Sequence, residues 1–553
     1  MPTLRWLTRD QDVRAAEKVP YRLLEEVPDL GYGDRDTGNM LIQGDNLDAL
    51  KSLLPFYAGQ VKCIYIDPPY NTQSAVSIHY DDNLEHSQWL GIMQPRLELL
   101  RELLSEDGLL FCQIDDHQGA YLTVLLDELF GRRNRMNVIS VKMSEATGVK
   151  MSHTAKRLPK MKETILVYKK SERPTIRPIS IPNGAWNDEY KELVLGVDRV
   201  KLDRLKELME QEQGTEEDLV EANSLVAGAE IVSLSKFFKE REIPVKEQDA
   251  FKWENAWRIV QAVGAGSIKN FALKRRRKGE EISSLLSSRK KLYIFKTEFS
   301  EESKDPRIRI IFADKYLTYH PGDFWPDIKT TGGVGAEGGV LFPNGKKPER
   351  LIERVFEIHT NAGDLVLDSF LGSGTTAAVA QNMGRRYIGI EMGDHAVTHC
   401  APRLKSVIDG EQSGISEARK WQGGGGFRFF RLGASVFDET GGLQPDVRFP
   451  TLAAHIWFSE MNQPWNPPAT PSPFLGTLGG KGIALLYNGI LGDKSVNGGN
   501  VLNRQTLRVI REAAGGFAGP ITVYGERTVL SEASLEAENL IFKQTPYDVR
   551  ARK

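Results

Sequence analysis

The sequence predicts an α/β protein with a doubly wound, mostly parallel, seven-stranded Rossmann-like sheet formed from two sequence halves. Apolar runs of strand length alternate with amphipathic runs of helix length over residues 39–170, and the same alternation returns over residues 340–432. Such alternation is typical of a parallel sheet covered by helices. Neither half contains enough strands for a complete sheet, so we expect the two halves to join.

The elements of both halves can be placed from their patterns. The first half is expected to contain strands at 61–67, 108–115, 137–143 and 163–170 and helices at 88–104 and 121–130. The second half is expected to contain helices at 348–359 and 375–384 and strands at 363–370 and 385–392. Gly384 marks the end of the second of these helices.

At 553 residues the chain exceeds the size of one ordinary domain. Between the two halves the composition changes to charged helical stretches and then to a basic region, which predicts an inserted domain over 171–339. The remaining segments are expected to be an N-terminal extension over 1–38 and a small C-terminal α/β domain over 433–553.

The composition also bears on location and on metals. No apolar stretch approaches the roughly 18 residues that a membrane span needs, and the first residues lack the apolar core of a signal peptide. We therefore expect a cytoplasmic protein with no membrane association. Cys63, Cys112 and Cys400 lie far apart in the sequence, which predicts neither a disulfide framework nor a metal site.

Positive charge is concentrated in one part of the expected insertion. Residues 251–300 contain twelve Lys and Arg against four Asp and Glu, although the net charge of the chain is only −2. The centre of this region consists of Lys274, Arg275, Arg276, Arg277 and Lys278. Such runs are often solvated loops, but the neighbouring aromatic residues favour contact with nucleic acid phosphates, because Lys and Arg displace counterions condensed there.

The motif DPPY at residues 67–70 ends the first strand abruptly. Two consecutive prolines remove two backbone donors and fix φ, so they hold Asp67 and Tyr70 rigidly just beyond the sheet. The exocyclic amine of a nucleobase is a poor nucleophile because its lone pair is delocalised into the ring. Asp67 and the Pro68 carbonyl would accept its two hydrogens, while Tyr70 stacks on a base that has left the duplex.

A second loop, DSFLGSGTT at residues 368–376, leads from an expected strand into a helix. Gly372 and Gly374 permit a tight turn and a close approach of the backbone to a ligand. The spacing matches neither the dinucleotide fingerprint, which fails at Ala377, nor a P-loop. Glu391 follows about 20 residues later and suits a ribose diol, so we expect a nucleoside ligand without a long phosphate tail.

These two motifs resemble those of S-adenosylmethionine-dependent amino methyltransferases that act on DNA. DPPY is typical of the adenine N6 enzymes, and FLGSG corresponds to their F-x-G-x-G loop. With DPPY first and an insertion before FLGSG, the order is similar to the β class, in particular to the modification (Mod) subunits of type III restriction-modification systems. The stretches GDNLDALKSL, KKPERLIERVF, GGGFRFFRLG and IFKQTPYDV also resemble that group, so the likeness extends from Leu41 to the end of the chain.

The resemblance implies a site-specific DNA adenine N6 methyltransferase with S-adenosylmethionine as cofactor and double-stranded DNA as substrate. It also implies that the sheet is a methyltransferase domain, that the insertion is a target recognition domain, and that a restriction helicase-nuclease subunit and a second copy of the chain are partners. The residues that it places in the catalytic motif are Asp67, Pro68, Pro69 and Tyr70. The residues that it places around the cofactor are Asp45, Lys347, Asp368, Phe370, Gly372, Ser373, Gly374, Thr375 and Glu391, without a metal.

Three of the predicted site residues have a purely structural alternative. Asp45 would bind the cofactor's adenine amino group, or it would cap the helix that begins NLDALKSLL. Lys347, next to Pro348, would lie beside the cofactor carboxylate, or it would be a solvated loop residue. Trp325 would pack against DNA or the target base, although a large aromatic residue in a loop more often packs locally.

Three other functions stay open on the sequence alone. Cytosine N4 methylation follows the same amine chemistry, although Ser rather than Asp is more usual at the first motif position. A DNA-binding specificity subunit without catalysis would only recruit a restriction partner, and the intact DPPY motif argues against it. RNA methylation is compatible with the motifs, but the basic insertion suits the reading of a duplex better.

Overall fold

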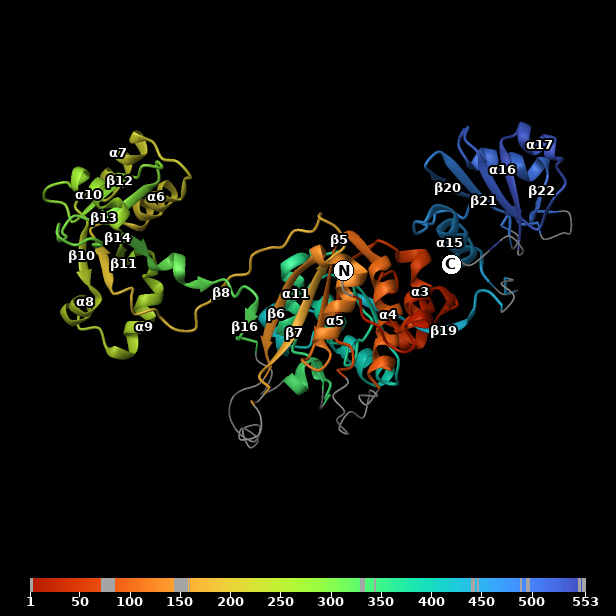
Figure 1. Cartoon of the computed structure of the whole chain (residues 1–553), viewed down its shortest axis with the longest axis horizontal. Helices are drawn as coiled ribbons and strands as arrows, with labels where there is room; N and C mark the ends of the chain where they lie inside the picture. Colours follow the sequence, from red (N-terminus) through yellow and green to blue (C-terminus); the bar gives the residue numbers. More distant parts are fainter. Residues whose placement is uncertain are drawn as a thin grey trace. The chain divides into compact units, whose positions relative to one another are not determined.

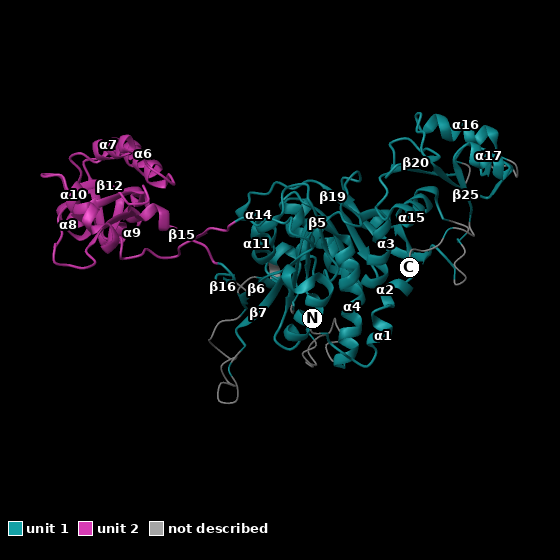
Figure 2. Cartoon of the chain, turned by 45° about the horizontal axis from the view of Figure 1, so that its top comes forward, with its two compact units in different colours: residues 1–177, 322–553 teal, residues 178–321 magenta. Residues whose placement is uncertain are grey.

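The computed structural model describes residues 3–70, 85–143, 158, 160–328, 334–342, 345–438, 443–444, 447–487, 490–493, 498–545 and 549. The chain forms two compact units (Figure 2). The large unit comprises Met1–Arg177 and Gly322–Lys553, and the small unit comprises Pro178–Pro321. Each is described below by itself.

The large unit is built around a mixed sheet in which the described residues form eleven strands. Its strands are β1 (Arg22–Glu26), β2 (Tyr32–Gly33), β3 (Met40–Gln43), β4 (Val61–Ile66), β5 (Leu104–Ile114), β6 (Arg135–Lys142), β7 (Lys162–Lys169), β16 (Phe324–Trp325), β17 (Leu365–Asp368), β18 (Arg386–Glu391) and β19 (Gly426–Ser435). They lie in the order β1-β19-β3-β18-β17-β4-β5-β7-β6-β16, and β2 pairs with β19.

The sheet is longer than the expected seven strands, and that number was wrong. Seven strands are direct neighbours in the order β3-β18-β17-β4-β5-β7-β6. Strands β19, β1 and β2 extend the sheet beyond β3, and β16 extends it beyond β6. Pairing is parallel from β19 through β3, β18, β17 and β4 to β5, whereas β7 runs antiparallel to both β5 and β6. The sequence pattern of β7 does not reveal this direction, because an antiparallel strand buried on both faces is as apolar as a parallel one.

Helices cover both faces of this sheet (Figure 1). The helices of the large unit that belong to the sheet are α1 (Arg9–Asp12), α2 (Ala15–Lys18), α3 (Asn46–Tyr57), α4 (His86–Leu103), α5 (Gly119–Leu126), α11 (Glu349–His359), α12 (Thr375–Asn382), α13 (Ala401–Ile408) and α14 (Gly414–Ala418). Helix α3 packs on α4, while α12 packs on both α11 and α13. The chain winds in one direction from β4 through α4 to β5 and in the other from β17 through α12 to β18, so the topology reverses between β17 and β4.

Short single-turn helices complete the backbone. The 3-10 turns are η1 (Pro28–Leu30), η3 (Arg132–Asn134), η5 (Ala256–Arg258), η6 (Gly266–Ile268), η7 (Ala313–Tyr316) and η8 (Val334–Gly339), and the π turns are η2 (Asp127–Gly131) and η9 (Ala396–Cys400). None of the described helices is both long and apolar enough to cross a membrane.

The C-terminal part of the large unit has its own sheet. Its strands are β20 (Phe474–Leu478), β21 (Lys481–Leu485), β22 (Val501–Leu502), β23 (Ile521–Gly525), β24 (Arg527–Thr528) and β25 (Leu540–Gln544), and its helices are α15 (Phe449–Met461), α16 (Arg504–Ala513) and α17 (Glu532–Ala537). Four of the strands form a sheet in the order β20-β21-β23-β25, and β22 pairs with β24. Helix α15 packs on α3, and its buried His455 lies edge-on to the ring of Tyr21.

The small unit contains a separate six-stranded sheet, counted over its described residues, in the order β10-β9-β11-β14-β13-β12. The strands of this sheet are β9 (Glu192–Leu195), β10 (Glu230–Ser233), β11 (Ile259–Gly264), β12 (Ile282–Leu286), β13 (Leu292–Lys296) and β14 (Arg307–Phe312). Strands β8 (Ile181–Pro182) and β15 (Thr318–Tyr319) pair separately. The helices of the small unit are α6 (Arg199–Glu210), α7 (Glu216–Leu225), α8 (Leu234–Glu240), α9 (Val245–Glu254) and α10 (Lys269–Arg275).

The small unit is shorter at both ends than the insertion expected over 171–339. The backbone N–H of Arg177 donates to the Ile358 carbonyl at 2.8 Å, which ties that end of the predicted insertion to the large unit. At the other end, β16 pairs in parallel with β6. Composition located the charged region, but these backbone hydrogen bonds place its boundaries.

Candidate active site

The carboxyl ends of four parallel strands lie side by side at one edge of the large sheet, because β3, β18, β17 and β4 are direct neighbours. An acidic residue stands at or just after each of these ends: Asp45, Glu391, Asp368 and Asp67. The edge includes the place where the topology reverses, which is where doubly wound sheets bind ligands. Residues from both sequence halves therefore share one site.

Both carboxylate oxygens of Asp67 have partners within this site. The Tyr70 hydroxyl donates to Oδ1 at 2.6 Å, and the ammonium of Lys347 forms an ion pair with Oδ2. The turn is also held from α4, because the indole N–H of Trp89 donates to the Pro69 carbonyl at 2.8 Å. The DPPY motif thus receives contacts from a lysine of the other half of the sequence.

Lys347 is not a solvated loop residue, and that alternative was wrong. Its side chain is 11% exposed, and its ammonium lies 5.2 Å from the centre of the Tyr70 ring as well as against Asp67. Its carbonyl accepts the Thr375 hydroxyl at 3.3 Å, which connects it to the glycine loop. Its place beside a cofactor carboxylate stays a prediction.

Burial governs the protonation of this cluster. Burial raises the pKa of the Asp67 carboxyl above its ordinary value, and the Lys347 charge offsets only part of that effect. Burial acts to lower the pKa of Lys347, but Asp67 and Glu163 outweigh it, and the net shift is upward. Burial also raises the pKa of Tyr70 well above its ordinary value. Near neutral pH, Lys347 is therefore charged and Tyr70 is a neutral phenol.

A chain of hydrogen bonds leads from Tyr70 into the sheet. The Tyr70 hydroxyl oxygen lies 2.8 Å from Glu163 Oε2, and Gln113 Nε2 donates to the same oxygen at 2.6 Å. The Tyr65 hydroxyl donates to Gln113 Oε1 at 2.6 Å. Sequence reasoning did not find Glu163 and Gln113. The available signal was a polar residue inside or at the start of an otherwise apolar strand, as in FCQID and ETILV.

The glycine loop between β17 and α12 follows a tight path. Gly372 and Gly374 have φ values of 57° and 83°, in the left-handed region that favours glycine. A Cβ atom on Gly374 would lie 3.2 Å from the Cα atom of Cys400, so the loop runs against η9. The Cys400 thiol donates to the Gly372 carbonyl at 3.2 Å. Both predicted glycines are required by this backbone.

Asp368 joins the two ends of the glycine loop. Its Oδ1 accepts the backbone N–H of Phe370 at 2.9 Å, and its Oδ2 accepts the Thr376 hydroxyl at 2.6 Å. The Phe370 side chain packs against the hydrophobic core. Burial raises the pKa of the Asp368 carboxyl to about 7, and the charges of Asp67 and Glu391 act in the same direction.

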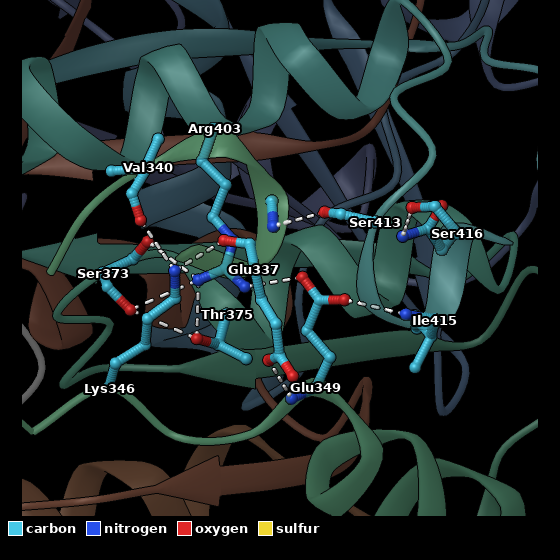
Figure 3. Close-up of polar contacts among 12 residues, drawn as sticks. Glu337, Val340, Lys346, Glu349, Ser373, Thr375, Arg403, Ser413, Ile415 and Ser416 are labelled. Atoms are coloured by element: carbon cyan, nitrogen blue, oxygen red, sulfur yellow. Dashed lines mark hydrogen bonds and ion pairs between the residues drawn. The ribbon is translucent and has the colours of Figure 1, made fainter. Parts of the chain in front are cut away.

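A buried ion pair supports the glycine loop from behind (Figure 3). Arg403 of α13 is 0% exposed, and its guanidinium donates to Glu349 Oε1 at 2.6 Å and to the Thr375 hydroxyl at 2.7 Å. The same guanidinium lies 3.3 Å from the carbonyl and the hydroxyl of Ser373. Ser373 and Thr375 therefore direct their polar groups inward, toward Arg403. Sequence reasoning missed Arg403 and Glu349, because each looks like an ordinary helical charge.

The segment before α11 is fastened to the same network (Figure 3). The Lys346 ammonium donates to the carbonyls of Gly335 at 3.2 Å, Glu337 at 2.5 Å and Val340 at 2.7 Å. Burial lowers the pKa of Lys346 to about 8. Glu337 accepts the backbone N–H of Glu349 at 3.0 Å, so this segment and the start of α11 are linked.

Glu391 and Asp45 are the other two acidic residues at the carboxyl ends of the parallel strands. Glu391 accepts the backbone N–H groups of Gly372 at 2.8 Å and Gly393 at 3.2 Å, one on each oxygen. Asp45 caps α3 by accepting the Leu47 N–H at 2.7 Å, and Arg96 binds both of its oxygens at 3.0 and 3.1 Å. The capping alternative therefore describes Asp45, and its contact with a cofactor adenine stays a prediction.

Trp325 corrects one expectation. It is 1% exposed, its indole N–H donates to the Gly322 carbonyl at 3.0 Å, and the Arg354 guanidinium lies 5.1 Å from its ring centre. The expected contact with DNA or the target base is wrong, and local packing accounts for this residue. Arg354 in turn pairs with Asp327.

The basic run of the small unit is partly engaged in ion pairs. Arg275 pairs with Glu216 at 3.1 Å, Arg276 with Glu301 at 3.3 Å and Arg277 with Glu280 at 3.8 Å. The flanking residues Lys274 and Lys278 are exposed. The role of all five residues in DNA binding stays a prediction.

The chain resembles known proteins over most of its length. Residues 61–401 match the family model N6_N4_Mtase, which is described as DNA methylase. The chain is 35% identical to the probable type III restriction-modification enzyme HindVI Mod subunit of Haemophilus influenzae, over 73% of this chain and 54% of that one. It is 27% identical to the EcoPI Mod subunit of Escherichia phage P1, over 70% of this chain and 62% of that one.

A third relative is the type III restriction-modification enzyme EcoP15I Mod subunit of Escherichia coli, at 26% identity over 83% of this chain and 74% of that one. The alignments with the first two relatives therefore span less than two thirds of those proteins. The family match extends over more than half of this chain and contains both the DPPY motif and the glycine loop. The chain belongs to the N6_N4 family of DNA methylases.

Proposed function

We propose that this chain is a site-specific DNA adenine N6 methyltransferase that uses S-adenosylmethionine. The observation that carries the proposal is the pairing of two loops at neighbouring strand ends. Asp67 and Tyr70 follow β4, and the glycine loop follows the adjacent β17. The carboxylate that would accept the amine hydrogens and the turn that would bind the cofactor therefore lie at one edge of the sheet. Direct transfer between two bound reactants requires such closeness.

The residues around the glycine loop fit the proposed cofactor. The positive φ values of Gly372 and Gly374 allow the tight turn of the loop, and the closeness of Gly374 to Cys400 leaves no space for a side chain there. Glu391 accepts one backbone N–H on each oxygen, and a carboxylate oxygen can accept more than one hydrogen bond, as the binding of a ribose hydroxyl would require. When bound, the cofactor supplies an electrophilic methyl group on a sulfonium.

Asp67 and the Pro68 carbonyl act on the target amine. They accept its two hydrogens, which favours a pyramidal nitrogen whose lone pair points outward. Lys347 and Tyr70 each contact one oxygen of Asp67, so the amine hydrogen takes a remaining lone pair of an oxygen that already has one partner. The Tyr70 ring stacks on the base, which has left the duplex.

Two further roles are part of the proposal. The small unit reads the target sequence, and its exposed Lys274 and Lys278 contact DNA phosphates. The chain is the modification subunit of a type III-like restriction-modification system, with a helicase-nuclease subunit as partner. Support comes from the relatives above, which are named as Mod subunits of type III enzymes.

The test is methyl transfer by the purified full chain to unmethylated bacterial genomic DNA. Labelled S-adenosylmethionine and nucleoside analysis by mass spectrometry should give N6-methyladenine with wild type and none with Asp67→Ala. Asp107→Ala, which removes a half-exposed carboxylate of β5, serves as the matched control and should keep activity. N4-methylcytosine as the product would reassign the base, and label only on RNA would reassign the substrate.

A wild-type chain that binds DNA and S-adenosylmethionine but transfers no methyl group would contradict the enzyme proposal. It would favour a specificity subunit that acts only by recruiting a partner. Single-molecule sequencing of genomic DNA from cells with and without the gene would then show no modified base. An active wild type would instead show the modified base together with its target sequence.

A further inference from the structure

Tyr70 brings two carboxylates to one hydroxyl group. Its oxygen lies 2.6 Å from Asp67 Oδ1 and 2.8 Å from Glu163 Oε2. A phenol has a single proton and donates to one acceptor at a time. While both carboxyl groups are ionised, the Tyr70 hydroxyl therefore donates to one of them at a time, and it bridges the two once one of them carries a proton, because two ionised carboxylates that share a site repel each other. The geometry is that of a proton shared among three side chains.

Glu163 is also held by a second donor on the oxygen that Tyr70 contacts. Gln113 Nε2 donates to Glu163 Oε2, and the Tyr65 hydroxyl on Gln113 Oε1 fixes which way the amide faces. Strand β7, which carries Glu163, is bonded to β5 on one side and β6 on the other. Glu163 is half-buried rather than fully enclosed.

We propose that Glu163, acting through Tyr70, receives the proton that leaves the exocyclic amine during methyl transfer; this inference rests on the proposed function. As the amine nitrogen bonds to the methyl carbon, the carbon–sulfur bond breaks and its electron pair stays on sulfur. The nitrogen then carries a positive charge, and one of its protons passes to the Asp67 carboxylate. Asp67 donates that proton to the Tyr70 oxygen while Tyr70 donates its own proton to Glu163.

The surrounding charges bear on this transfer. Burial raises the pKa of Asp67, but the ammonium of Lys347 pairs directly with it and favours the ionised form to which Asp67 must return. Lys160 lies 5.7 Å from the centre of the Tyr70 ring and is paired with Asp115 at 2.7 Å. Asp368 is a further carboxyl group whose charge interacts with Asp67. A second acceptor thus returns Asp67 to the state that binds the next amine.

The first test is the single-turnover rate of methyl transfer by the full chain with Glu163→Gln. Glutamine keeps the shape and the contact with Gln113 but cannot take the proton. The rate should fall about 100-fold, a common contribution of a positioned proton acceptor, while the affinity for S-adenosylmethionine stays within twofold. Glu172→Gln, which changes an exposed carboxylate just after β7, is the matched control and should leave the rate unchanged.

The second test asks whether Tyr70 and Glu163 act as one path. Tyr70→Phe keeps the ring that stacks on the base and removes only the hydroxyl. Its loss should equal that of Glu163→Gln, and the double variant should lose no more than either single variant, because members of one path are not additive. Losses that multiply in the double variant would overturn the relay.

The third test separates proton transfer from mere positioning. Glu163→Ala leaves space for a small carboxylate, so sodium formate should restore the rate several-fold. Sodium chloride at the same ionic strength should not restore it, and this control is needed because salt weakens DNA binding. A merely structural Glu163 would make the variant respond equally to both salts, and that outcome would overturn the proposal.

These outcomes are distinct from those of the proposed function. An inactive wild type rejects the methyltransferase proposal, whereas an active wild type with a Glu163→Gln rate within twofold rejects the relay alone. Thermal unfolding and S-adenosylmethionine binding establish that each variant is folded. If Glu163→Gln does not fold, Tyr70→Phe at its wild-type rate still overturns the relay.

Discussion

The DPPY turn after β4 and the glycine loop after β17 lie at neighbouring strand ends, yet different kinds of groups hold them. In the DPPY turn, the side chains of Asp67 and Tyr70 bond to each other and to Lys347 and Glu163. In the glycine loop, the backbone conformation is special, and Arg403 supports it from behind. The DPPY turn therefore depends on the functional groups of its side chains, whereas the glycine loop depends on the conformation of its backbone.

The largest expected effect comes from changing one atom of the Asp67 side chain in the DPPY turn. Asp67→Asn keeps the size of the side chain but replaces an accepting oxygen with a donating NH2 group. Methyl transfer should fall about 100- to 1,000-fold, the range seen when one preorganised polar contact is lost. S-adenosylmethionine binding, measured by calorimetry, should change less than threefold. A comparable loss of cofactor affinity would contradict the division between the two loops.

The next effect concerns the support behind the glycine loop. Arg403→Met leaves the carboxylate of Glu349 buried without its partner, so the free energy of unfolding should fall by about 3 kcal/mol. Adding Glu349→Gln should recover part of this loss, because the amide oxygen can still accept the Ile415 N–H seen at 3.1 Å. Chemical denaturation measures both variants.

A matched control for that support is the partly exposed pair of Arg428 and Glu26. Arg428→Met should cost much less than Arg403→Met, because exposed ion pairs contribute little. Equal losses in the free energy of unfolding for the two arginines would show that burial does not make the Arg403 network more important for stability than an exposed ion pair.

A smaller effect should separate the cost of a left-handed backbone, which two glycines share, from a role in cofactor binding, which we expect of only one of them. Gly374 and Gly363 have φ values of 83° and 84°, but a Cβ atom on Gly363 would have no heavy atom within 4 Å. Alanine at Gly363 should cost about 1–2 kcal/mol of stability, the cost of a left-handed residue. Gly374→Ala should cost more, because its Cβ atom would also lie 3.2 Å from the Cα atom of Cys400. Gly374→Ala alone should also weaken S-adenosylmethionine binding about tenfold, or 1.4 kcal/mol. Equal weakening by Gly363→Ala would contradict a specific role of the loop.

The smallest effect is a pH dependence at the glycine loop. The Asp368 carboxyl has its pKa raised by burial to about 7 in the folded chain. A raised carboxyl pKa means that the folded state binds the proton more tightly, so this contribution to stability falls as pH rises toward 7 and is constant above it. Relative to Asp368→Asn, the wild type should therefore lose about 1 kcal/mol between roughly pH 6.3 and pH 8. A difference that does not change with pH in denaturant titrations would rule this out.

Much of the architecture could be predicted from local patterns. The strand that ends in DPPY, the helix before β17 and the strand that ends on Glu391 were expected within a few residues of β4, α11 and β18. The edge strands were not, because β19 and β1 belong to the sheet through pairing with β3 and with each other, which local patterns do not show. The boundaries of the insertion were also missed, since they depend on hydrogen bonds such as that of Arg177 to Ile358.

The sequence by itself determined the two motifs and their chemistry, because the rigidity of Pro-Pro and the freedom of glycine are properties of adjacent residues. Only the tertiary structure decided what those motifs meet. Strand order brings Lys347 to Asp67, places Glu163 beside Tyr70 and buries Trp325. Contacts between residues distant in sequence follow from strand order and register, and neither can be read from local composition.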